Sequence, residues 1–123
     1  MKHSAEYYIE HLEMEPHVEG GYFKECLLEK EERNLWSSIY FMLAKGEVSH
    51  FHRLKSDEVW YYHDGNALTI YMIDEAGKLT AAKLGLDLEK GEVPQVLVPK
   101  GMIFGSAMEE EGFSLVGCMV SPC

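Results

Sequence analysis

The chain has 123 residues, of which 46% are hydrophobic, and this is enough for one domain with its own core. Its formal net charge is −10, so a phosphate backbone would be repelled and nucleic acid is not an expected partner. No apolar run reaches the ~20 residues of a membrane-spanning helix, and a membrane partner is not expected either.

The cysteines indicate a reducing compartment. There are three, Cys26, Cys118 and Cys123, and their spacing matches no zinc motif. The first residues lack the apolar core of a signal peptide. We therefore expect reduced thiols and a cytoplasmic protein.

A short amphipathic helix is expected near the N-terminus. Ser4 can cap it, and apolar residues recur at helical spacing from residue 5 to residue 12. Pro16 is expected to end this helix. Gly20 and Gly21 then mark a turn into an extended segment at residues 22–29.

The rest of the chain has the pattern of short strands separated by turns. Asp64-Gly65 is a hairpin signal, and other turns are expected at residues 74–77 and 99–101, with a polar loop at 85–91. About nine strands at regular spacing predict an all-β barrel or sandwich in a single domain, residues 1–123. A homodimer is expected because exposed edge strands need cover. The expected strands are residues 22–29, 36–43, 48–52, 58–63, 67–73, 79–84, 95–98, 102–107 and 113–121.

The segment 46–65 holds the candidate chemistry. In a regular strand His50 and His52 point the same way, as do Glu58, Trp60 and Tyr62. Two imidazoles and one carboxylate could bind zinc, iron, manganese or nickel. A divalent metal held by His50, His52 and Glu58 is therefore one hypothesis, with a metal-dependent oxidoreductase as the corresponding function.

Acid–base catalysis is the second hypothesis. Glu58 could orient His52 and raise its basicity, while Tyr40 or Tyr62 donates a proton to the other face of a substrate. This arrangement suits an isomerase or epimerase that removes a proton next to a carbonyl. The same His–Glu pair also occurs as a plain buried hydrogen bond.

Ligand binding without catalysis is the third hypothesis, as in a sensing module. A barrel mouth could be lined by aromatic rings that stack on a sugar or base and by polar groups that orient it, or the rings could simply pack in the core. The candidate ligand-binding residues are Trp60, Tyr62, Phe104, Gln95 and Ser106.

The chain resembles the cupin superfamily, whose fold is a jelly roll or double-stranded β-helix. The first cupin motif is matched in loosened form from Gly46 to Gly65, with His50, His52 and Glu58 at its ligand positions. The second motif is matched by the turn at residues 99–101, but its metal-binding histidine is replaced by Phe104. This replacement disfavours a metal cofactor.

A closer resemblance, to the cupin subfamily known as DUF985 (Cupin_5), covers nearly the whole chain. It rests on residues 16–23, 37–41, 51–60, 84–85, 94–99 and 115–122, and the subfamily fixes the histidine at His52 rather than at His50. The resemblance implies a jelly roll similar to nucleotide-sugar epimerases, and hence a carbohydrate or nucleotide-sugar ligand. It also implies that Glu25 contributes to the pocket, although a bulged edge strand would explain the same stretch.

Overall fold

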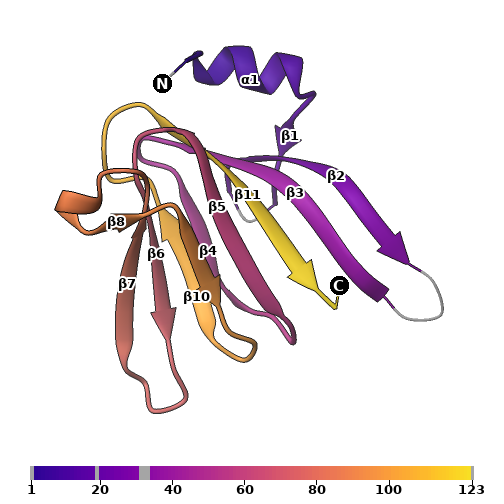
Figure 1. The fold of residues 1–123 in the computed structure, drawn as a ribbon, viewed down its shortest axis with the longest axis vertical. Coiled ribbons are helices and arrows are strands. Elements are labelled where there is room, and N and C mark those ends of the chain that lie inside the picture. Colours follow the sequence, from indigo (N-terminus) through magenta and orange to yellow (C-terminus); the bar gives the residue numbers. More distant parts are fainter. Residues whose placement is uncertain (1, 19, 31–33, 123) are drawn as a thin grey trace.

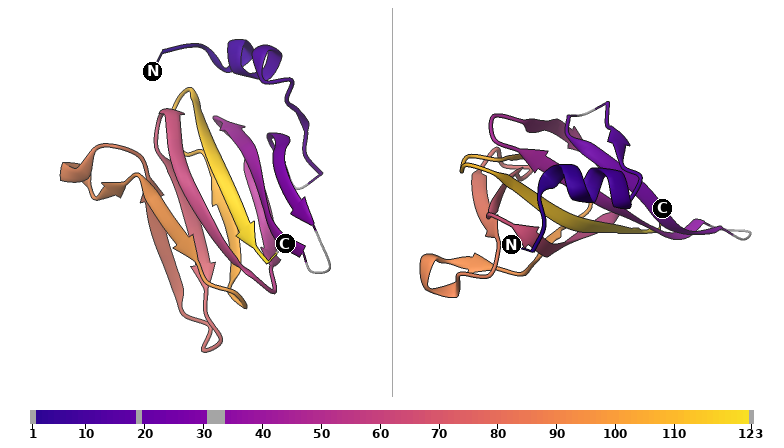
Figure 2. Two further views of the ribbon diagram at one scale, coloured as in Figure 1. Left: turned by 45° about the vertical axis from the view of Figure 1, so that its right-hand side comes forward. Right: turned by 90° about the horizontal axis from the view of Figure 1, so that it is seen from above.

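The computed structural model describes residues 2–18, 20–30 and 34–122, which form a short helix and two β-sheets (Figures 1 and 2). One sheet has six strands in the order β1-β2-β3-β11-β5-β9, and the other has five in the order β4-β10-β6-β7-β8. The elements are α1 (Ala5–His11), β1 (Glu15–Pro16), β2 (Tyr22–Lys30), β3 (Asn34–Ala44), β4 (Val48–Arg53), β5 (Asp57–Gly65), β6 (Leu68–Ile73), β7 (Leu79–Leu84), the 3₁₀ helix η1 (Leu88–Lys90), β8 (Glu92–Val93), β9 (Gln95–Val98), β10 (Ile103–Ala107) and β11 (Phe113–Ser121).

The order of the strands is that of a jelly roll. Strand β11, the last in the chain, lies between β3 and β5, and β10 lies between β4 and β6. Strands distant in sequence therefore pair, while the short hairpins join neighbours such as β6 and β7. The predicted all-β fold is confirmed.

Helix α1 forms as expected but ends earlier. The Ser4 side chain accepts a hydrogen bond from the Tyr7 amide at 3.2 Å and so caps the N-terminus. The helix stops at His11, before Glu13 takes a positive φ of 55°. The prediction that Pro16 ends the helix is therefore wrong. Pro16 lies in β1 opposite Tyr22. None of the helices in the described part of the chain is long and apolar enough to cross a membrane.

The main core lies between the two sheets. Its members come from alternate positions of the strands, as expected for side chains that point to one face. The buried residues are Phe41, Leu43, Trp60, Leu68, Ile70, Met72, Leu84, Val96, Val98, Phe104, Met108, Val116 and Cys118.

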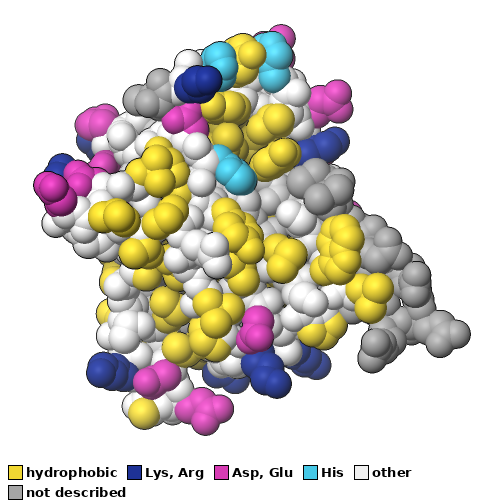
Figure 3. All heavy atoms as spheres, viewed as in Figure 1, with side chains coloured by type: hydrophobic (Ala, Val, Ile, Leu, Met, Phe, Trp, Pro, Cys, Tyr) yellow, Lys and Arg dark blue, Asp and Glu magenta, His cyan; other side chains and the backbone are white. Residues whose placement is uncertain are grey.

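A second cluster lies on the opposite face of the six-stranded sheet, under α1. Met42 and Leu115 alternate with main-core residues of β3 and β11 and pack against the apolar side of the helix. Asp64 fixes this cap, because its carboxylate accepts hydrogen bonds from the Tyr8 hydroxyl (2.7 Å) and the Lys2 amide (2.8 Å). Hydrophobic side chains also cover much of the face shown in Figure 3.

Candidate functional site

Strand β5 places a carboxyl group inside the protein. Glu58 is only 8% exposed, and its neighbour on the same face, Trp60, is 3% exposed. The indole Nε1 of Trp60 donates a hydrogen bond to Glu58 Oε1 at 2.7 Å. Because an indole nitrogen only donates, this bond leaves the second carboxyl oxygen for other partners.

Burial makes Glu58 an unusual acid. Desolvation raises its pKa from 4.5 to about 7, although the Trp60 hydrogen bond and the charge of His52 act in the opposite direction. A carboxyl group with this pKa exchanges its proton near neutral pH. It is therefore suited to act as a general acid.

A β-bulge in β4 separates the two histidines of the His-x-His motif. In the register, Phe104 of β10 lies opposite His52, whereas Ser106 lies opposite Ser49. Two steps along β10 thus correspond to three along β4, and the extra residue reverses the alternation of side chains. Ser49 and His52 face the interior, while His50 is exposed.

The expectation that His50 and His52 share a face is therefore wrong. Gly105 explains why the bulge fits here, because a Cβ atom at this position would lie 2.8 Å from the Ser49 carbonyl oxygen and 3.3 Å from the Phe51 amide nitrogen. Only glycine leaves room for the bulged backbone to approach β10 so closely.

The backbone of His50, and not Glu58, orients His52. The His52 ring contacts the His50 carbonyl oxygen through Nδ1 at 3.0 Å. Because a carbonyl oxygen only accepts, Nδ1 carries the proton and Nε2 of the neutral ring has a free lone pair. The ring also packs on Phe104, with a centroid distance of 4.4 Å. His52 can thus act as a base.

His52 and Glu58 line one small cavity with a volume of about 60 Å³. No hydrogen bond or ion pair joins the two side chains. The apolar part of the wall comes from β3, β5 and β11 of the six-stranded sheet, and β4 of the other sheet contributes Ser49 and His52. The cavity is lined by His17, Ile39, Phe41, Ser49, His52, Glu58, Trp60 and Cys118.

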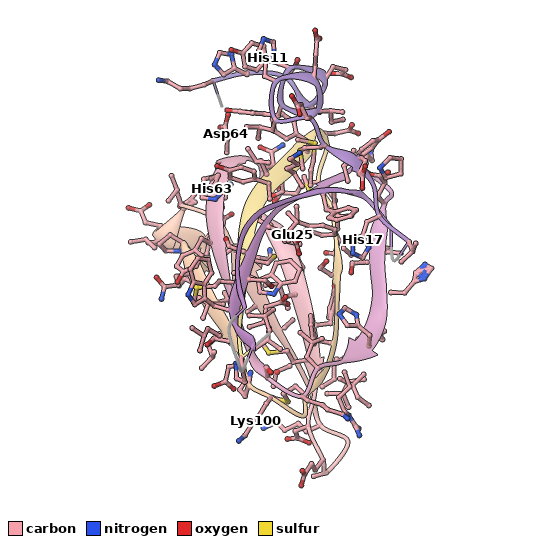
Figure 4. The ribbon with its side chains drawn as sticks, turned by 90° about the vertical axis from the view of Figure 1, so that its right-hand side faces the viewer. His11, His17, Glu25, His63, Asp64 and Lys100 are labelled. Carbon is pink, nitrogen blue, oxygen red and sulfur yellow. The ribbon has the colours of Figure 1, made fainter. Side chains whose placement is uncertain are left out.

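Five of these wall residues were not predicted as site residues from the sequence: the apolar Ile39 and Phe41, and also His17, Ser49 and Cys118. His17 lies in the connection between β1 and β2, where its amide bonds the Gly21 carbonyl at 2.9 Å. Its ring meets Phe23 edge-on at 4.8 Å. Figure 4 shows His17 on the side of the molecule formed by this connection. A signal for His17 was present, because it lies within the DUF985 pattern at residues 16–23.

Cys118 also lies within the DUF985 pattern, at residues 115–122, whereas Ser49 lies outside it. Cys118 of β11 is buried and free of disulfide bonding. Burial raises the pKa of its thiol well above the ordinary value, and the nearby Glu58 adds to this effect. The thiol is therefore held neutral. Ser49 reaches the wall only because of the bulge.

Two predicted site residues lie away from the cavity on the outer face of the six-stranded sheet. Tyr40 packs with the cluster under α1, and its ring lies 5.8 Å from that of His63. It alternates with the wall residues Ile39 and Phe41 and so points to the other face. Gln95 is exposed on the edge strand β9, on the face opposite to its buried neighbour Val96. The structure does not bring either residue to this cavity.

The other predicted residues lie at varying distances from the cavity. Phe104 is buried behind His52, and Ser106 is buried opposite Ser49. Tyr62 lies farther along β5 and bonds the Gly65 carbonyl. Glu25 lies beside the wall residue Ile39 in the register but is exposed and lines a separate surface hollow (Figure 4).

The geometry of the cavity does not suit the predicted metal site. Within the described ranges, no three His, Cys, Asp or Glu side chains are grouped so that they could hold a metal ion. His50 points out of the cavity, and the second-motif position holds the apolar ring of Phe104. The residues present do not fit the predicted triad.

The whole-chain comparison decides the family. Residues 6–123 match the model described as Cupin superfamily (DUF985). The chain belongs to this cupin family. No curated protein matches it.

Solved structures show the same fold. A protein of Shewanella oneidensis is 60% identical with a TM-score of 0.92, over 98% of this cupin and 78% of that chain. A hypothetical protein from Leishmania major is 35% identical with a TM-score of 0.90, over 98% and 82%. A mutant of Bacillus subtilis oxalate decarboxylase is 21% identical with a TM-score of 0.66, over 88% and 26%, and this shows similarity of fold alone.

Proposed function

We propose that this cupin binds a small carbonyl compound in the cavity and moves protons on it with His52 and Glu58. The observation that carries the proposal is the separate anchoring of the two groups. The His50 carbonyl fixes His52 and the Trp60 indole fixes Glu58, yet both side chains face the same space. Environments that differ in this way separate the roles of two titratable groups.

His52 Nε2 takes a proton from the carbon next to the carbonyl, while the protonated Glu58 gives its proton to the carbonyl oxygen. The products are an enol, an imidazolium and a carboxylate. If the carbon next to the carbonyl carries a hydroxyl group, the enol is an enediol. Transfer of the imidazolium proton to the former carbonyl carbon, with loss of the other hydroxyl proton to the Glu58 carboxylate, completes an isomerisation and restores both side chains.

Solvent exchange tests this function. The protein is incubated in D₂O with carbonyl compounds, and loss of the adjacent C–H signal is followed by NMR. We expect exchange with the native chain and a loss of about 100-fold or more in His52→Ala and Glu58→Gln. Matched controls are His11→Ala on α1 and Glu75→Gln in the exposed turn after β6, both distant from the cavity.

The controls should exchange at the native rate. Native-rate exchange in His52→Ala would contradict the proposal, and absence of exchange with every carbonyl compound would leave only a binding function. The homodimer expected from the edge strands stays a prediction, which sedimentation of the native chain would test.

A further inference from the structure

The outer face of the six-stranded sheet is apolar where α1 does not cover it. Side chains alternate between the two faces of each strand, and those on the inner face are the core and cavity residues. The strand register aligns the outer side chains in two rows that cross β3, β11, β5 and β9, and neither row has a charge. The rows are Tyr40, Gly117, Tyr61 and Gln95, and, beside it, Ser38, Met119, Val59 and Leu97. The water-facing side of an antiparallel sheet normally carries polar side chains, so an apolar one indicates an interface.

Helix α1 leaves these rows open. It packs on Met42 and Leu115, which lie one row closer to its end of the sheet. The left view of Figure 2 shows α1 beyond the upper end of the strands, and Figure 3 shows hydrophobic side chains across the surface below it. Leu97 is 52% exposed, and Tyr61 and Met119 are half-buried. The single chain therefore leaves apolar area of this face in contact with water.

We propose that this face binds a second copy of the chain, with the two six-stranded sheets packed face to face about a twofold axis. Two identical chains each have a net charge of −10 and repel each other, so they can meet closely only where their surfaces are uncharged. The two rows form such a surface. The same negative charge disfavours an anionic membrane surface as the occupant. A twisted sheet also packs well on a sheet of the same twist, with the strands about 30° apart.

The pattern along β5 is self-complementary. On the outer face Val59 and Tyr61 are flanked by Asp57 on one side and by His63 on the other, and the His63 ring lies over Gly117. A twofold axis that crosses the strands between the two rows brings Asp57 opposite the partner's His63. An imidazole N–H donates to a carboxylate, so the two ends of the face pair with each other. This axis also places the two α1 helices at opposite ends of the interface, where they do not collide.

The size of the face sets the strength of the dimer. Four strands about 4.8 Å apart, each with about five uncovered residues at about 3.4 Å along the strand, span roughly 330 Å² in plan. Two such faces bury roughly 700 Å² in plan, and more along the contours of their side chains, so the interface is at the low end of the range for specific complexes, below about 1,200 Å². We therefore expect a dimer that dissociates on dilution.

Sedimentation equilibrium over a range of protein concentrations tests the proposal. Leu97→Glu and Met119→Glu each place a carboxylate in the proposed interface, and exposed Leu97 can be replaced without disturbing the core. Phe51→Glu is the matched control, because Phe51 is 53% exposed but lies on β4 of the other sheet. Circular dichroism verifies that each variant is folded.

The average mass of the native chain should rise from 14.0 kDa toward twice this value as the concentration increases. Leu97→Glu and Met119→Glu should each raise the dissociation constant about 100-fold, because a charge would be buried against apolar side chains. Phe51→Glu should leave it unchanged. A native chain that stays monomeric at about 1 mM, well above the dissociation constant of a specific dimer, would overturn the proposal. A dimer that persists in both face variants, or one that dissociates in Phe51→Glu, would overturn it as well.

Discussion

Trp60 and Glu58 form a hydrogen-bonded pair two residues apart on one face of β5, with the indole Nε1 2.7 Å from Glu58 Oε1. The pair is buried, and it fixes the carboxyl group beside the cavity. Burial raises the pKa of this group to about 7, and the Trp60 bond limits the rise.

Trp60→Phe should raise the pKa of Glu58 further. The substitution keeps an aromatic ring but removes the donor that stabilises the carboxylate. The titration of Glu58 can be followed by the ¹³C shift of its side-chain carboxyl. Trp36→Phe in β3 is the control, since Trp36 is not part of the cavity wall. A Glu58 pKa unchanged in Trp60→Phe would show that the hydrogen bond has no influence on the acid.

Glu58 should make the protein less stable as the pH rises. Its folded pKa, about 7, lies above its ordinary value of 4.5, so the folded chain binds the proton more tightly than the unfolded chain. The resulting stabilisation is complete below pH 4.5 and is lost as the pH rises through 7. Glu58→Gln should remove this part of the pH dependence, which is worth about 3 kcal/mol at most. Urea unfolding at pH 5 and pH 8 measures this dependence. If the native chain and Glu58→Gln lost the same stability between the two pH values, the prediction would be contradicted.

Gly105→Ala should destabilise the protein by about 1–3 kcal/mol. The new Cβ would meet the Ser49 carbonyl at 2.8 Å and push against the bulge. Since the bulge directs His52 inward, proton exchange should fall together with stability. Thermal unfolding and the exchange assay measure the two effects, and a variant with native values for both would show that the bulge tolerates a side chain here.

Tyr8→Phe should loosen α1 by about 1–2 kcal/mol, because the Tyr8 hydroxyl donates to the Asp64 carboxylate. Burial opposes ionisation of Asp64, but the hydrogen bonds from Tyr8, Lys2 and Gly65 outweigh it and lower its pKa from 3.8 to about 2. The stabilisation is therefore present above pH 3.8 and is lost as the pH falls toward 2. Hydrogen exchange of the α1 amides measures it. Tyr7→Phe is the control, since the Tyr7 ring stacks on His3 and His11 without contacting Asp64.

The native protein should contain no stoichiometric transition metal. His50 is turned away from His52 and Glu58, and Phe104 occupies the position of the usual fourth ligand. Elemental analysis of protein purified without chelator checks this expectation. One metal ion per chain that disappears in His52→Ala would contradict it and would support the oxidoreductase hypothesis.

The sequence by itself determined where the strands lie and that their apolar residues form a core. Alternation of apolar residues, with turns such as Asp64-Gly65, was sufficient for the all-β fold, and the segments that resemble DUF985 cupins identified the jelly roll. It also placed Glu58 and Trp60 on one face, because β5 is regular where these residues lie and a period of two holds there.

Only the tertiary structure decided which side chains share the cavity. The bulge in β4 depends on contact with Gly105 in β10, more than 50 residues later in the chain, and no local pattern in β4 reveals it. It turned His50 outward and brought Ser49 beside His52. Tyr40 was assigned to the wrong face for a related reason: both faces of β3 are apolar, one for the main core and one for α1, so periodicity alone could not tell which face borders the cavity.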